Sequence, residues 1–302
     1  MGKSSKKTCA RNIRTGSLTK TYRDIVYQSP DGLALYARDY GGNGPALLCM
    51  HGLTRNSADF HDLALHLRGR FRVISVDQRG RGRSAYDPTV ANYRPDVYCA
   101  DMLALLGQLN LSSVIVIGTS MGALMTMMMA ASNPGLFSAA VINDIGPEID
   151  PAGLKRIAGY VGKTAPFENW AAAANVLKAQ GPDVFPKYSE AEWMDFARRT
   201  CVETDDGRVR FNYDPAIAEP FNSDDTVAAP PDMWPLYEAL NNIPVLVIRG
   251  ATSDILAPET AQKMVATHPN AGLVTIPNIG HAPMLTEPES LAAIDAFLES
   301  LS

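Results

Sequence analysis

The chain has 302 residues, of which 46% are apolar and 20% are charged, a composition typical of a globular protein with a sizeable core. Its formal net charge is −5, from 27 basic and 32 acidic residues. This balance provides no strong positive field, so we exclude a basic nucleic-acid-binding groove. The length fits either one large α/β unit or two average domains.

The spacing of the cysteines and the hydropathy of the chain indicate in which cellular compartment the protein is expected. Cys9, Cys49, Cys99 and Cys201 are widely separated and form no C-x-x-C pair, so neither a zinc site nor a compact disulfide framework is predicted. The longest nearly apolar run, residues 121–131, is shorter than the ~20 residues of a membrane-spanning helix. The basic N-terminus lacks the apolar core of a secretion signal. We expect residues 1–18 to form a flexible basic tail, and we expect a cytoplasmic protein without membrane association.

The first part of the chain alternates between strand and helix patterns. Two β-prone runs, 25–27 and 33–36, flank the turn signature Pro30-Asp31-Gly32 and predict an antiparallel pair. Continuous apolar runs follow, which are typical of parallel strands buried on both faces. The segments between them have helical spacing of apolar residues. The predicted strands are 46–50, 71–76 and 114–117, and the predicted helices are 58–67 and 97–109.

The alternation breaks after a further predicted strand at 139–142. Residues 147–240 are rich in Pro, Ala, Trp and Asp, with short amphipathic helices but no strong strand run. Strand patterns return at 245–248 and 273–276, with helices at 258–266 and 289–301. We therefore predict an α/β fold with a mostly parallel sheet flanked by helices. Its core comprises residues 19–146 and 241–302, and a helical cap comprises residues 147–240.

The strongest chemical signal is the G-x-S-x-G pentapeptide Gly118-Thr119-Ser120-Met121-Gly122. It lies directly between the apolar run 114–117 and the helix-prone segment 123–131. A strand that enters a helix through so sharp a turn forces its central residue into strained dihedral angles and needs small residues two positions before and after. This context predicts that Ser120 is a nucleophile exposed above the sheet.

A serine hydroxyl needs a base to accept its proton and an acid to orient that base. Of the five histidines, His281 follows the last predicted strand, at the sheet edge where Ser120 also emerges, so we predict it to be the base. Asp254 follows the preceding strand and completes the chain order Ser, Asp, His, so it is the predicted acid. Asp144, also at a strand end, is the main alternative.

Acyl transfer passes through an oxyanion that two backbone N–H groups can stabilise. We predict these donors to be the amide of Met121, next to the nucleophile, and the amide of Leu53, in the loop His51-Gly52-Leu53-Thr54. His51 itself is predicted to fix that loop rather than act as a base. The arginines Arg79, Arg81 and Arg83 are interpreted as parts of a structural loop rather than a phosphate site.

Together these motifs resemble the α/β-hydrolase fold superfamily over about residues 22–302. The matching features are His51-Gly52, the segment 77–84 (DQRGRGRS), the pentapeptide 118–122, Asp254 and Gly280-His281. The resemblance implies a Ser120/Asp254/His281 triad beneath a helical lid, without cofactor or metal. Ser120 differs from the aspartate nucleophile of epoxide hydrolases and haloalkane dehalogenases, which argues against both activities.

The expected activity is hydrolysis of a small or medium carboxylic ester or lactone through an acyl-enzyme, with a small molecule as the only predicted partner. Aromatic residues of the cap are candidates for the substrate pocket: Phe167, Trp170, Trp193 and Trp234. Three alternatives stay open at this point. They are a carbon–carbon bond hydrolase of a meta-cleavage-type diketone, a cofactor-free haloperoxidase or perhydrolase, and a ligand receptor built on a hydrolase scaffold.

Overall fold

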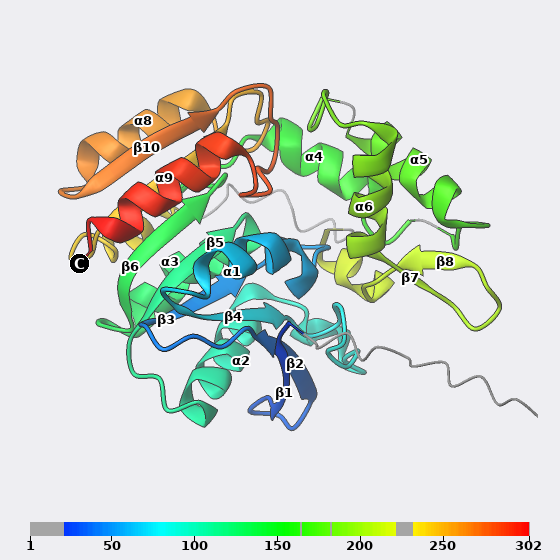
Figure 1. Ribbon diagram of the computed structural model, residues 1–302, viewed down its shortest axis with the longest axis horizontal. Helices are drawn as coiled ribbons and strands as arrows, with labels where there is room; N and C mark the ends of the chain where they lie inside the picture. The colour runs from blue at the N-terminus through cyan, green and yellow to red at the C-terminus, as the bar shows by residue number, and fades with distance from the viewer. Residues whose placement is uncertain (1–20, 164, 182, 222–231, 302) are drawn as a thin grey trace, which may run out of the picture.

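A computed structural model describes residues 21–163, 165–181, 183–221 and 232–301 (Figure 1). Its centre is an eight-stranded sheet with the order β1-β2-β4-β3-β5-β6-β9-β10. β1 and β2 are antiparallel to each other, β2 is antiparallel to β4, and all other neighbours are parallel. The strands are β1 Arg23–Gln28, β2 Ala34–Asp39, β3 Ala46–Met50, β4 Arg72–Asp77, β5 Val114–Thr119, β6 Phe137–Asn143, β9 Val245–Gly250 and β10 Ala271–Ile276.

Alternate residues of the central strands enter two different hydrophobic clusters. In β3, Leu48 and Met50 pack on one side of the sheet while Leu47 and Cys49 pack on the other. This two-sided burial explains why the runs are continuously apolar, and it confirms the prediction of a mostly parallel sheet covered on both faces. All eight predicted strands are present, with ends that differ by at most three residues.

Helices cover both faces of the sheet. α1 His61–Leu67 and α9 Pro288–Glu299 lie on one face, in front of the sheet in Figure 1. The other face is covered by α2 Pro95–Gln108, α3 Met121–Ser132, α7 Trp234–Glu238 and α8 Pro258–Thr267. Each helix presents an apolar stripe to the strands, which is what holds the three layers together.

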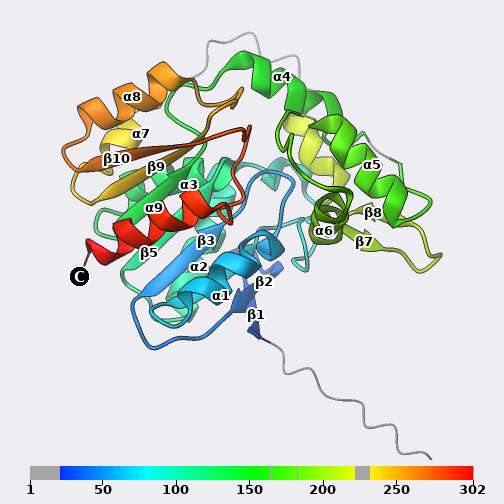
Figure 2. The same cartoon turned by 45° about the horizontal axis from the view of Figure 1, so that its top comes forward.

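The elements between β6 and α7 form a separate group beside the sheet (Figures 1 and 2). These are α4 Pro151–Tyr160, α5 Trp170–Gln180, α6 Glu190–Thr200, β7 Cys201–Glu203, β8 Val209–Phe211 and the 3₁₀ helix η3 Pro215–Phe221. The side chain of Asn169 caps α5, and a capping box between Ser189 and Glu192 begins α6. A cluster centred on Trp193 and Phe185 gives α5, α6 and the hairpin their own core.

Two features of this region differ from the sequence-based expectation. The β7–β8 hairpin was not predicted, because three-residue strands are too short to produce an apolar run. α7 packs against α3 through the main core, so it does not share the core of α5 and α6.

The basic tail predicted for residues 1–18 lies outside the described residues. No helix in the described part of the chain is long and apolar enough to cross a bilayer.

Candidate active site

Ser120 lies on the tight turn between β5, which ends at Thr119, and α3, which begins at Met121. Its backbone has φ 52° and ψ −118°, a strained conformation for a residue with a Cβ atom. The two flanking glycines permit this turn. A Cβ atom on Gly122 would lie 2.1 Å from the carbonyl oxygen of Met50, and one on Gly118 would lie 2.6 Å from the amide nitrogen of Ala123. The turn therefore places the Ser120 hydroxyl at the carboxyl edge of the sheet.

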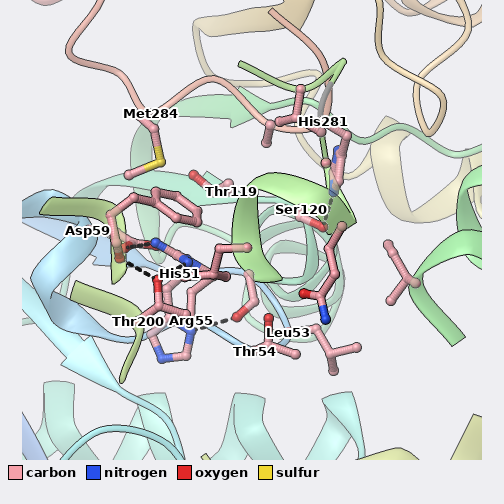
Figure 3. A pocket seen from close by; sticks show the side chains of 18 of the residues that line it. His51, Leu53, Thr54, Arg55, Asp59, Thr119, Ser120, Thr200, His281 and Met284 are labelled. Carbon is pink, nitrogen blue, oxygen red and sulfur yellow. Dashed lines mark hydrogen bonds and ion pairs between the residues drawn. The ribbon is translucent and has the colours of Figure 1, made fainter. Parts of the chain in front are cut away.

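Ser120, His281 and Asp144 form a continuous hydrogen-bonded line. The Ser120 Oγ atom lies 2.9 Å from His281 Nε2 (Figure 3). On the other side of the ring, His281 Nδ1 lies 2.9 Å from Asp144 Oδ2. The other Asp144 oxygen accepts the amide proton of Gly250 at 2.8 Å. Asp144 is fully buried and the His281 side chain is 8% exposed. An anionic Asp144 stabilises the tautomer with a proton on Nδ1, which leaves Nε2 free to accept the serine proton.

The prediction that Asp254 orients His281 is wrong in this structure. Asp254 instead accepts two hydrogen bonds from Arg156 of α4, from Nε at 2.5 Å and from Nη2 at 2.8 Å. Asp144, the alternative acid, takes the position beside His281, because β6 lies between β5 and β9 and delivers Asp144 directly to the edge. Asp254 lies four residues beyond the end of β9, on a loop within reach of the cap.

The amides of Leu53 and Met121, the predicted oxyanion donors, both lie near Ser120. Neither donates a hydrogen bond to any residue that the structure describes. Met121 is the first residue of α3, where backbone N–H groups have no partner within the helix. A Cβ atom on Gly52 would lie 3.5 Å from the Cβ atom of Ser120, so the Leu53 loop runs directly beside the nucleophile. Two unpaired N–H groups thus lie close to the serine.

His51 fixes the peptide that carries the Leu53 amide. Its Nε2 atom accepts the amide proton of Gln78 at 3.1 Å, so the ring proton is on Nδ1, which donates to the carbonyl oxygen of Gly52 at 2.7 Å. Burial lowers the pKa of His51 to about 3, so the ring is neutral near pH 7. The position supports the sequence-based interpretation of His51 as a loop-fixing residue.

Arg55 connects the same loop to the cap. Its Nε and Nη2 atoms donate to Asp59 at 2.7 and 2.6 Å, and its Nη1 atom donates to the Thr200 hydroxyl at the end of α6 at 2.5 Å (Figure 3). The guanidinium also lies 4.1 Å from the ring centroid of Phe196. The neighbouring Asn56 donates to the carbonyl oxygen of Arg199 at 2.8 Å. The loop beside Ser120 is therefore anchored to α6.

The three arginines of the segment 79–83 have protein partners. Arg79 donates to Asp101 and Asp31, Arg81 donates to the carbonyl oxygen of Leu53 at 2.9 Å, and Arg83 pairs with Asp24. Arg79 and Arg81 are fully buried. These contacts agree with a structural loop and leave no cluster of free cations for a phosphate.

A cavity of about 160 Å³ lies between the sheet edge and the cap, and both Ser120 and His281 line it. Most of its wall is apolar and comes from both layers: Leu53, Phe60, Ile157, Leu177, Val184, Phe185, Trp193, Phe196, Phe211 and Met284. Its polar wall includes Arg55, Asp59, Arg156, Tyr160 and Gln180. Among the described residues, no group of three His, Cys, Asp or Glu side chains is arranged to hold a metal ion.

Of the four aromatic residues predicted to line the pocket, Trp193 does so and three do not. Phe167 is buried inside the cap, edge-on to Phe211. Trp170 donates to Glu203 on the cap surface, and Trp234 donates to Glu148 beneath the ammonium group of Lys263. Amphipathic spacing identifies aromatic residues on the packed side of a helix, but it does not show whether they face the cavity, the inside of the cap or a polar partner at the surface.

Sequence reasoning also missed the two cavity arginines, Arg55 and Arg156. Arg55 lies two residues after Leu53, so its proximity to the oxyanion loop could have been anticipated from its place in the chain. Arg156 had no such signal, because its place in the wall depends on how α4 packs over the loop after β9.

Comparison with known proteins places this geometry in a family. The model of the Alpha/beta hydrolase family matches residues 47–294. The chain is 34% identical to a 3-hydroxybutyrate-oligomer hydrolase of Cupriavidus necator, over 89% of this chain and 94% of that protein. It is 28% identical to a 2-(acetamidomethylene)succinate hydrolase of Mesorhizobium japonicum, over 86% of this chain and 90% of that protein.

Solved structures of similar proteins point to the same family. A crystal structure of an alpha/beta hydrolase from Novosphingobium aromaticivorans is 48% identical and superimposes with a TM-score of 0.88, covering 92% of this chain and 98% of that one. The residues that the family model matches include the strands from β4 to β10 and the turn that carries Ser120. The chain belongs to the alpha/beta hydrolase family.

Proposed function

We propose that this hydrolase cleaves short carboxylic esters through an acyl-enzyme on Ser120. The observation that carries the proposal is the line from Ser120 Oγ through His281 to the buried Asp144, with 2.9 Å at each step. A serine, a histidine and a carboxylate in this order form the arrangement that activates a hydroxyl group for attack on a carbonyl.

In the first half-reaction, Ser120 Oγ attacks the ester carbonyl carbon while its proton passes to His281 Nε2. The carbonyl oxygen becomes an oxyanion within reach of the Leu53 and Met121 amides, which are free to donate to it. His281 then returns the proton to the alkoxy oxygen as the carbon–oxygen bond breaks, and the alcohol leaves.

In the second half-reaction, a water molecule loses a proton to His281 Nε2 and attacks the acyl carbon of the Ser120 ester. The intermediate breaks its bond to Ser120 Oγ, which takes the proton back from His281, and a carboxylic acid is released. Throughout, Asp144 stays ionised and stabilises the imidazolium form of His281.

The substrate class follows from the cavity and from one relative. A small, mostly apolar cavity favours a short acyl chain over a long one. The relative of Cupriavidus necator is named for 3-hydroxybutyrate oligomers, whose hydroxy acid units are joined by ester bonds. We therefore propose an ester or lactone of a short hydroxy acid.

The first experiment is hydrolysis of p-nitrophenyl butyrate by the purified chain and by the Ser120→Ala variant. We expect turnover by the wild-type chain, loss of it in the variant, and unchanged thermal unfolding. Ser132→Ala, on the exposed end of the same helix, is the matched control and retains turnover. A fluorophosphonate probe labels the wild type and the Ser132 variant, but not the Ser120 variant.

Full activity of the Ser120→Ala variant contradicts the proposal. A wild-type chain that cleaves a vinylogous diketone in preference to esters indicates a carbon–carbon bond hydrolase with the same triad. Peroxide-dependent halogenation in acetate indicates a perhydrolase. Tight ligand binding without turnover indicates a receptor.

A further inference from the structure

Arg156 is the one cavity-lining cation among the described residues whose counter-ion does not also line the cavity. Arg55 lines the wall together with Asp59, which neutralises it within the cavity. Arg156 also lines the wall, but its partner Asp254 is not part of the lining. The cavity therefore presents a guanidinium whose negative partner lies behind it.

The pairing with Asp254 fixes the orientation of Arg156. Two parallel hydrogen bonds, at 2.5 and 2.8 Å, use the guanidinium edge formed by Nε and Nη2. Tyr160 also interacts with the guanidinium, but Asp254 is the only carboxylate that pairs with it among the described residues, so the edge that includes Nη1 can meet a second planar anion. Because the side chain is held by its partner, little conformational entropy is lost when that edge binds a ligand.

Tyr160 extends this polar patch by one helical turn of α4. It lines the cavity beside Arg156, at the i+4 position of the same helix face. Burial raises the pKa of its phenol, although the charge of Arg156 acts in the opposite direction, so the hydroxyl keeps its proton near pH 7. The patch thus consists of hydrogen-bond donors in a wall that is otherwise mostly apolar.

The position of Arg156 identifies which half of the substrate it meets. The amide of Thr252, on the Asp254 loop, donates to the carbonyl oxygen of Ile279, on the His281 loop, at 3.0 Å. The two loops therefore run side by side, and the Arg156–Asp254 pair lies on the His281 side of the cavity. His281 gives its proton to the leaving alkoxy oxygen, so the alcohol half of an ester lies on this side.

We propose that Arg156 binds a free carboxylate on the alcohol half of the substrate, so that the preferred ester is one whose alcohol is itself a short hydroxy acid. This inference rests on the proposed ester hydrolysis and specifies its substrate.

The test compares two esters that share an acyl group: 3-butyryloxybutyrate and its primary carboxamide, as the same enantiomer. Both form the same butyryl-enzyme, so deacylation is identical and the ratio of their kcat/KM values reports only recognition of the alcohol half. Release of butyrate is measured by chromatography. For the wild type we expect the carboxylate to be preferred by about 10- to 100-fold, the range of one charge-assisted hydrogen bond.

Variants separate recognition from a structural role. Arg156→Met with Asp254→Asn removes both charges, and we expect the ratio to fall to about one through a higher KM for the carboxylate. Asp254→Asn alone removes only the counter-ion and raises the ratio, an effect that a structural ion pair would not produce. Arg156→Lys retains part of the preference. Lys155→Met, which removes a neighbouring exposed cation of α4, leaves the ratio unchanged and is the matched control.

A wild-type ratio near one, or a ratio that survives in the double variant, overturns the proposal. Binding of the two esters to Ser120→Ala by calorimetry tests recognition without turnover. Preferential binding of the carboxylate there, without wild-type ester hydrolysis, would contradict the proposed reaction but retain the role of Arg156. Equal binding with normal hydrolysis of p-nitrophenyl butyrate would contradict the role of Arg156 alone.

Discussion

His51 donates its Nδ1 proton to the carbonyl oxygen of Gly52 at 2.7 Å, and this contact determines where the next amide points. In a trans peptide the C=O and N–H groups point in opposite directions. A carbonyl held against His51 therefore directs the Leu53 N–H to the other side of the peptide. The amide of Arg55 donates to the same carbonyl oxygen at 3.2 Å and supports this orientation.

Removal of this contact is expected to lower kcat rather than affinity. His51→Leu frees the Gly52–Leu53 peptide to rotate, and loss of an oriented oxyanion donor costs about 10²- to 10³-fold in kcat in other enzymes. His51→Asn keeps an N–H donor near the position of Nδ1 and should retain more of the activity. The measurement is kcat and KM for p-nitrophenyl butyrate. An equal loss in both variants, or an effect on KM alone, would contradict the orienting role.

The same histidine makes stability depend on pH. Burial lowers the pKa of His51 to about 3 in the folded protein, whereas an unfolded histidine titrates near ~6.5. Between these values the unfolded chain binds the additional proton, so the contribution is fully present above ~6.5 and is lost as the pH falls toward about 3. We expect ~2 kcal/mol less stability from this group at about pH 5 than at about pH 7.5.

Urea unfolding at these two pH values checks the effect of His51. The His51→Asn variant should lose less stability than the wild type between them, because its side chain does not titrate. The comparison is between the two slopes, since the pKa values of His61 and His268 are also lowered by burial and contribute to both proteins. Equal slopes would show that His51 is not the group responsible.

The two candidate acids should differ strongly in their effect on turnover. Asp144→Asn removes the negative charge beside Nδ1 of His281, and the corresponding change in a serine protease lowers kcat by about 10⁴. Asp254→Asn leaves that hydrogen bond in place, and its loss of kcat on p-nitrophenyl butyrate should be at least ~100-fold smaller. Equal losses in the two variants would contradict the assignment of Asp144 as the acid.

The parallel sheet and the turn that carries Ser120 could be predicted from the sequence for a physical reason. Parallel strands buried on both faces must be continuously apolar, so runs such as 114–117 are distinctive. The turn at Ser120 needs glycine at 118 and 122 because the backbone of β3 and α3 leaves no space for a Cβ atom. Both requirements concern residues that are close together in the sequence, so the amino-acid types at those positions show them directly.

The acid could not be chosen in the same way. Asp144 and Asp254 both follow strands, at the same sheet edge and in the same chain order relative to Ser120 and His281. Their roles diverge only in three dimensions, where Arg156 from α4 binds Asp254 and the neighbouring strand brings Asp144 to His281. These contacts join residues about a hundred or more positions apart, and single-sequence patterns do not record them.

A buried ion pair away from the cavity should dominate the stability of the segment 77–84. Arg79 is 1% exposed and donates to both oxygens of Asp101, which is fully buried, at 2.7 Å each. Arg79→Met leaves that carboxylate buried without a partner, which costs about 3–5 kcal/mol. Arg83→Met, which removes a half-exposed pair with Asp24, should cost at most ~1 kcal/mol. Urea unfolding compares the two, and similar losses would contradict the importance of burial.

Replacement of two helix glycines by alanine should change the stability of the chain in opposite directions. A Cβ atom on Gly122, in the first turn of α3, would lie 2.1 Å from the carbonyl oxygen of Met50, so Gly122→Ala must move the helix away from β3. We expect a loss of about 1–3 kcal/mol, together with lower kcat because Ser120 moves with the helix. A Cβ atom on Gly107, near the end of α2, would meet no neighbouring group within 4 Å, so Gly107→Ala should stabilise the chain by about 0.5–1 kcal/mol without changing kcat. Thermal unfolding and p-nitrophenyl butyrate turnover measure both effects, and a stable, fully active Gly122→Ala variant would show that the turn at Ser120 tolerates a side chain at that position.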